Sequence, residues 1–248
     1  MPVPVDVHHE LATAPNGKFI DVYRPGTHPT PLATVLLWHG IGPDERDVLE
    51  PLARTVAGLG ALVFVPDWRS DAPDGGRAHL LASLEYARTH AAALGGDAGR
   101  MVLAGWSAGA SAAMGVALNP AVADGWRPAA VVGIASRYDR PARTTGTPPL
   151  ADLAVGGPSD PLPVPVSLVH GTADELMDTT CSRELLESLI THRWPARLEE
   201  VRANHAGAIG AEYDPALDRC RASEDELIRA AAELTARTIA EAAGVPAA

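Results

Sequence analysis

The feature that most constrains the fold of this chain is a Gly-x-Ser-x-Gly motif that runs from Gly105 to Gly109, with Ser107 at its centre. A short apolar run at 101–104 precedes the motif, and a helix-like stretch follows it. This order predicts a strand, a sharp turn and a helix, with the serine hydroxyl exposed at the tip of a strained turn. The amide after the serine then lies at a helix N-terminus, where it favours negative charge.

Strand-like and helix-like segments alternate along the rest of the chain, which predicts a mostly parallel sheet with helices on both faces. The strand candidates are continuous apolar runs, as expected for strands that are covered on both sides. They lie at 33–38, 61–66, 101–104, 129–135, 164–170 and 196–201, and a hairpin is expected from 5–11 and 19–23. Helices are expected at 44–58, 77–94, 107–118, 178–192 and 223–243, the last capped by Ser223.

The length of 248 residues fits a single α/β domain over 1–248 without a large cap domain. The segment 136–163 is rich in Pro, Gly and Thr and has little periodicity. Long loops in compact domains often cover sites, so this segment is either a short lid or a surface excursion.

The net charge of −11 argues against nucleic acid or an anionic membrane surface as the main partner. No apolar stretch approaches the roughly 18 to 20 residues of a membrane helix, and no signal peptide is visible. We therefore expect a cytoplasmic protein that does not bind membranes. Cys181 and Cys220 are too few for a disulfide framework or a zinc site, and free thiols are expected.

A serine nucleophile needs an adjacent base, and the base needs an orienting carboxylate. When the serine follows a central strand, the acid and then the histidine follow it along the chain. Asp174 lies just past the expected strand 164–170, and His205 lies just past 196–201. Parallel strands end at one edge of the sheet, so Ser107, Asp174 and His205 are predicted to meet there.

Two other carboxylates are alternatives for the acid. Asp139 follows the preceding strand, and Asp178 lies four residues after Asp174, where it can instead cap the next helix. Asp174 can also be a simple turn residue, and His205 can be structural.

An oxyanion hole needs two N–H donors aimed at the developing negative charge. The amide of Ala108 is one expected donor. The other is expected from the loop after 33–38, with Ile41 first and Gly42 as the next candidate. His39 is expected to shape this loop through hydrogen bonds rather than to transfer protons.

Trp106, Trp68 and Arg69 lie at strand ends on the same edge and are the expected substrate-pocket residues. An indole supplies apolar contact area, and Arg69 either binds a substrate carboxylate or forms a structural ion pair. The short 136–163 segment can roof only a compact pocket, which predicts acyl chains of about two to six carbons. No metal or other cofactor is expected, because no cluster has ligand spacing.

With these motifs, the chain resembles the α/β-hydrolase fold and, within it, small esterases of the alpha/beta-hydrolase-3 or BD-FAE kind. The resemblance spans roughly residues 30–210, although Ile41 stands where relatives often carry glycine. The matching residues are His39-Gly40-Ile41-Gly42, Asp67-Trp68-Arg69 with Pro73, Gly105-Trp106-Ser107-Ala108-Gly109-Ala110, His170-Gly171-Thr172-Ala173-Asp174 and Asn204-His205.

The resemblance implies a serine hydrolase that cleaves a small carboxylic ester through an acyl-enzyme on Ser107. The same triad also serves acyltransferases, cyclases, thioesterases and formamidase-like amide hydrolases. A ligand-binding protein without catalysis is a further alternative, since fold does not determine function. A small acyl compound is the expected partner, and the oligomeric state is not predicted.

Overall fold

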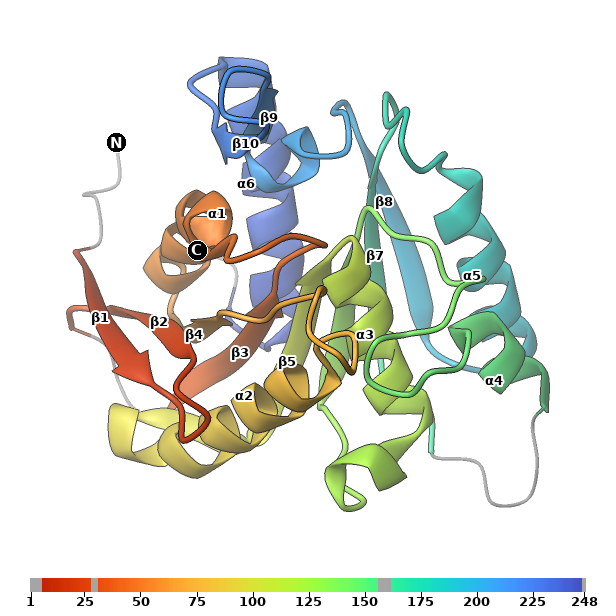
Figure 1. Cartoon of the computed structure of the whole chain (residues 1–248), viewed down its shortest axis with the longest axis horizontal. Helices are drawn as coiled ribbons and strands as arrows, with labels where there is room; N and C mark the ends of the chain where they lie inside the picture. Colours follow the sequence, from red (N-terminus) through yellow and green to blue (C-terminus); the bar gives the residue numbers. More distant parts are fainter. Residues whose placement is uncertain (1–5, 28–30, 156–161, 247–248) are drawn as a thin grey trace.

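An eight-stranded sheet that is parallel over most of its width forms the centre of the molecule (Figure 1). The computed structural model describes residues 6–27, 31–155 and 162–246. The strand order is β1-β2-β4-β3-β5-β6-β7-β8, in which the β1–β2 and β2–β4 pairs are antiparallel and all other neighbouring pairs are parallel. The strands are β1 Val7–Thr13, β2 Phe19–Pro25, β3 Leu32–Trp38, β4 Ala61–Pro66, β5 Gly96–Trp106, β6 Ala130–Ile134, β7 Val166–Gly171 and β8 Ala196–Val201.

The inner strands form where the apolar runs predict them. Every residue of β4, β6 and β7 is buried, because helices cover both faces of the sheet. β5 begins at Gly96, earlier than expected, in a position where an added Cβ would crowd Thr34 of β3 and Leu62 of β4. The absence of a side chain at Gly96 therefore lets this strand pair along a greater length.

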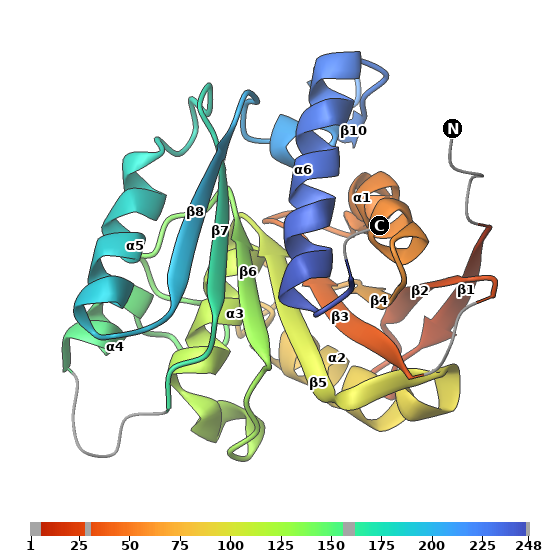
Figure 2. The ribbon, with the colours of Figure 1, turned by 180° about the vertical axis from the view of Figure 1, so that it is seen from behind.

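Two separate apolar cores lie on the two faces of the sheet. Figure 2 shows α1 and α6 in front of one face, and the other helices cover the opposite face. The helices are α1 Arg46–Gly58, α2 Arg77–His90, α3 Ala108–Leu118, α4 Pro149–Val155, α5 Thr180–Thr191 and α6 Glu226–Ala242. Short 3₁₀ turns occur at η1 Ala92–Leu94, η2 Pro120–Ala123 and η3 Gly207–Ile209.

Some local features differ from the expectation. The helix expected to continue to residue 94 ends at His90 and is followed by η1. The cap of α6 is Asp225, whose carboxylate accepts from the amides of Leu227 and Ile228, whereas Ser223 donates to Glu212 instead. An additional hairpin of β9 Ala211–Asp214 and β10 Arg219–Ala222 stands above the sheet edge (Figure 1).

Parts of two expected segments, residue 5 of the first strand and 156–161 of the expected lid, lie outside the described residues. In the portion that is described, no helix combines the length and apolar character needed to cross a membrane. Cys181 and Cys220 are free thiols, as expected.

Candidate active site

Ser107 lies on a strained turn between β5 and α3. Its φ of 55° and ψ of −123° are unusual for a residue with a side chain. A Cβ at Gly105 would overlap the backbone of Gly109, so the turn can be this tight only with glycine there. The Ser107 amide donates to the Ile134 carbonyl at 2.8 Å, and the Ser136 hydroxyl donates to the Ser107 carbonyl at 2.7 Å. These contacts hold the strained conformation in place.

Asp174 and His205 meet at the same edge of the sheet. The Nδ1 atom of His205 lies 2.7 Å from Oδ2 of Asp174. The other carboxylate oxygen, Oδ1, accepts from the amides of Leu176 and Met177 at 3.0 and 2.9 Å. The carboxylate is therefore fixed on both sides, and it leaves Nε2 as the ring nitrogen of His205 that is available for proton transfer.

A second histidine, His170, also contacts this carboxylate. It is fully buried, and its Nε2 lies 3.4 Å from Asp174 Oδ2 and 2.8 Å from the Met177 carbonyl, while Nδ1 lies 2.7 Å from the Ser182 hydroxyl. Burial alone would raise the pKa of Asp174. Hydrogen bonds from His170 and His205 overcome this effect and hold the pKa well below its usual range. Asp174 is therefore an anion at neutral pH. No role was expected for His170 from the sequence, although it lies near the end of β7 in the same motif as Asp174.

The two alternative acids make other contacts. Asp139 forms a two-pronged ion pair with Arg137, with both N···O distances at 2.7 Å. Asp178 accepts from the Thr180 amide at 2.9 Å, at the start of α5. Only Asp174 of the three candidates lies against His205.

Trp106, the residue before Ser107, supports His205. The Trp106 indole N–H donates to the His205 carbonyl at 3.0 Å, and the two ring centroids are 5.2 Å apart. This contact ties the His205 loop to the serine turn. The described residues contain no hydrogen bond between the Ser107 hydroxyl and His205, a contact that often forms only when substrate is bound.

Two of the three expected oxyanion donors, Ile41 and Ala108, lie in the wall of one cavity. Ile41 and Ala108 both line it, and neither amide donates to another group in the described part of the chain. Gly42 does not line this cavity, whereas Ile41 does. This placement favours Ile41 over Gly42 as the partner of Ala108.

His39 holds this loop from inside the protein. It is fully buried, its Nδ1 lies 2.9 Å from the Gly40 carbonyl, and its carbonyl accepts from the Trp68 indole at 3.1 Å. Burial lowers the pKa of His39 to about 4, so the ring is neutral at physiological pH. A neutral ring can donate from Nδ1 to Gly40 while Nε2 accepts from the Trp68 amide at 3.4 Å.

One group of potential metal ligands occurs in the described residues. His39, Asp44 and Asp67 each offer an atom within 4.8 Å of the others. However, Arg46 binds the Asp44 carboxylate at 2.7 and 2.9 Å, and Lys18 binds Asp67 at 2.8 Å. These cations already compensate both carboxylates, so the group fits a network that supports the loop after β3.

The three residues expected to form the substrate pocket do not line a cavity beside Ser107 and His205. Trp68 is fully buried against His39, and Trp106 is 4% exposed and packs on His205. Arg69 forms an exposed ion pair with Asp71 at 2.6 Å, which is the structural alternative considered for it. Two cavities flank the site, as described next, and none of these three residues lines either of them.

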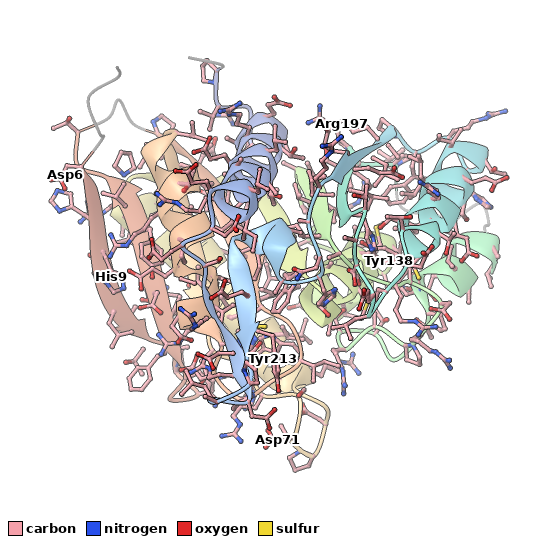
Figure 3. All side chains as sticks on the ribbon, turned by 90° about the horizontal axis from the view of Figure 1, so that it is seen from above. Asp6, His9, Asp71, Tyr138, Arg197 and Tyr213 are labelled. Carbon is pink, nitrogen blue, oxygen red and sulfur yellow. The ribbon has the colours of Figure 1, made fainter. Side chains whose placement is uncertain are left out.

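Two cavities flank the candidate triad instead. The first, here called the arginine cavity, has a volume of about 170 Å³ and is lined by Ile41, Ala108, Ser111, Arg137, Arg140 and Arg143, among others. The second, here called the histidine cavity, has a volume of about 650 Å³ and is lined by Ala173, Glu175, Leu176, His205, Tyr213 and Cys220, among others. Figure 3 looks onto this edge of the sheet, with Tyr213 of β9 in view.

Residues 136–155, which make up most of the described part of the expected lid, are anchored to the body of the protein. The Ser136 hydroxyl donates to Ser107, and the Thr144 hydroxyl donates to the Ala112 carbonyl of α3 at 2.7 Å. The segment ends in α4, which contacts α3 and α5. These residues form a fixed wall of the arginine cavity.

No protein-family model and no curated protein matches the sequence. Solved structures nevertheless match nearly the whole chain. Esterase 2 of Thermogutta terrifontis has a TM-score of 0.71 at 17% identity, covering 100% of this chain and 98% of that chain. A protein described as a dienelactone hydrolase from Klebsiella pneumoniae has a TM-score of 0.69 at 19% identity, covering 96% and 99%. An alpha/beta hydrolase from a Medee basin deep-sea metagenome has a TM-score of 0.67 at 16% identity, covering 98% and 100%. The expected α/β-hydrolase fold is confirmed.

Proposed function

We propose that this α/β-hydrolase-fold chain is a serine hydrolase that cleaves small carboxylic esters. The observation that carries the proposal is the 2.7 Å contact between His205 and Asp174, at the same sheet edge as the strained turn of Ser107. A nucleophile, a base and an orienting anion are the three groups that acyl transfer requires.

In the first step, the Ser107 oxygen attacks the ester carbonyl carbon while Nε2 of His205 takes the hydroxyl proton. The carbonyl oxygen becomes an oxyanion that accepts from the amides of Ile41 and Ala108. Asp174 stabilises the imidazolium, because it remains an anion and already contacts Nδ1.

In the second step, the tetrahedral intermediate collapses, the C–O bond to the leaving group breaks, and His205 returns its proton to the departing alcohol. Water then attacks the acyl-enzyme with His205 again as base. Expulsion of the serine oxygen releases the carboxylic acid and restores the Ser107 hydroxyl.

One of the similar proteins supports this chemistry through the groups that it has bound. The Thermogutta esterase has been captured with propionate, with butyrate and in a form phosphorylated by paraoxon. The small arginine cavity beside the proposed oxyanion donors likewise suits a compact acyl group rather than a long chain.

A serine-reactive fluorophosphonate tests the proposal. We expect it to label Ser107 in the native protein and to leave Ser107→Ala unlabelled. Ser111→Ala is the matched control, because Ser111 lies in the first turn of α3, which begins directly after Ser107, and lines the arginine cavity. Equal labelling of the native protein and Ser107→Ala would refute the assignment, and methyl ester hydrolysis followed in a pH-stat checks turnover.

A further inference from the structure

The arginine cavity has an unusual charge for this protein. Arg137, Arg140 and Arg143 all line it, and no acidic residue is among the described residues of its wall. The chain as a whole carries a net charge of −11, so three arginines around one small space stand out from the acidic background. A cavity lined by one sign of charge concentrates ligands of the opposite sign.

Nearby carboxylates compensate only part of this charge. Both oxygens of Asp139 are bound by Arg137 at 2.7 Å, and Arg140 reaches the same carboxylate only at 3.7 Å. Arg143 has neither a hydrogen bond nor an ion pair with any side chain that the structure describes, and it is half-buried beside Gly75. Among the described residues, Asp139 is the one carboxylate that pairs with any of these three guanidinium groups, which leaves two positive charges at the cavity.

The chemistry of the proposed reaction assigns the two cavities to the two halves of the substrate. The carbonyl oxygen must face the amides of Ile41 and Ala108, which lie at the arginine cavity. The leaving group must lie beside His205, which lines the histidine cavity. The acyl chain therefore extends toward the arginines. The histidine cavity is largely apolar, and its one charged wall residue, Glu175, would repel an anion there.

We propose, on the basis of the proposed function, that the acyl group of the substrate carries a free carboxylate in addition to its ester carbonyl. Arg143 and Arg140 bind this carboxylate. Guanidinium groups bind carboxylates through paired charge-assisted hydrogen bonds. The cavity volume of about 170 Å³ holds roughly six groups of the size of water, at about 30 Å³ each. The natural substrates are thus monoesters of short dicarboxylic acids with about four or five carbons.

The test compares monomethyl succinate with methyl butyrate, two four-carbon acyl groups that differ in the terminal carboxylate. Hydrolysis is followed by pH-stat titration, so that no chromogenic leaving group is needed. We expect kcat/KM to be at least about 10-fold higher for monomethyl succinate. Arg143→Gln and Arg140→Gln should each remove most of this preference, measured as the ratio of kcat/KM for monomethyl succinate to kcat/KM for methyl butyrate.

Arg100→Gln is the charge-matched control, because Arg100 pairs with Asp97 near the start of β5, away from the strand ends that carry the site. Succinate should also slow fluorophosphonate labelling of Ser107, butyrate should not, and the effect of succinate should disappear in Arg143→Gln. Equal kcat/KM for the two esters, equal protection by the two acids, or a preference that survives in both arginine variants would overturn the inference. Failure of Ser107 to be labelled at all would instead refute the proposed function.

Discussion

His39 should make the protein unstable in mild acid. The unfolded imidazole titrates near 6.5, and burial lowers the pKa in the folded protein to about 4. Above pH 6.5 the ring is neutral in both states, so it contributes no pH dependence. As the pH falls below 6.5, the unfolded chain binds a proton that the folded protein does not, and folding stability falls.

The magnitude follows from the two pKa values. Each unit of difference corresponds to about 1.4 kcal/mol, so the complete loss is about 3–4 kcal/mol and is reached only below pH 4. By about pH 5 the loss from His39 alone should be roughly 2 kcal/mol, out of a total stability of typically 5–15 kcal/mol for a domain. For a chain of this size, that corresponds to a decrease in Tm of about 4–8 °C.

The assay is urea unfolding followed by circular dichroism at about pH 7.5, 6 and 5, for the native protein and for His39→Asn. The asparagine amide can still donate toward the Gly40 carbonyl but does not titrate. Other titrating groups affect both proteins alike, so the difference between their pH slopes isolates His39. The native protein should lose about 2 kcal/mol more than the variant between pH 7.5 and 5. Equal slopes, or an NMR titration of the His39 ring near 6.5, would refute the reasoning.

Three further predictions concern the candidate site. Asp174→Asn should lower kcat by about 10²-fold or more, because the asparagine favours the wrong tautomer of His205. If Asp139→Asn abolishes hydrolysis and Asp174→Asn does not, the triad acid is misassigned. Gly109→Ala should destabilise the protein by about 2 kcal/mol and impair fluorophosphonate labelling of Ser107, because the new Cβ would overlap the Trp38 carbonyl. Gly58→Ala is the control: its new Cβ would have its nearest contact at 3.8 Å, so this variant should keep a near-native Tm. Ester hydrolysis should survive extended EDTA treatment, and inactivation that a divalent ion reverses would contradict the prediction that no metal is needed.

The strands and the relative positions of Asp174 and His205 could be predicted because they follow from strong local signals. Continuous apolar runs define strands that are buried on both faces, and residues just past parallel strands necessarily share one edge of the sheet. The tight turn at Ser107 was similarly predictable, since its glycines are required by backbone contacts that any such turn makes.

The cavity walls could not be predicted in the same way. Trp68 and Trp106 were expected to line the pocket because they follow strands, but each indole N–H donates to an internal carbonyl, and both rings are buried. The arginines that do line a cavity come from a Pro- and Gly-rich segment without periodicity. Only the folded path of that segment brings them into one cavity with Ala108, next to Ser107.

The unpredicted elements have local explanations. α4 has only seven residues, too few for a clear helical period. In the hairpin of β9 and β10, Arg221 pairs with Glu212 and Asp214 across the strands. The hairpin is therefore stabilised partly by charge pairs and lacks the apolar alternation that predicts a strand.

The two cavities are built by segments that are far apart in the sequence. The wall of the arginine cavity comes largely from residues 136–143, whereas Tyr213 and Cys220 of the β9–β10 hairpin contribute to the histidine cavity. In the proposed reaction, selection of the acid and selection of the alcohol are thus separable properties. Exchange of the hairpin can change which alcohols are released without altering which acids are accepted, so this scaffold can diversify one half of its substrate range at a time.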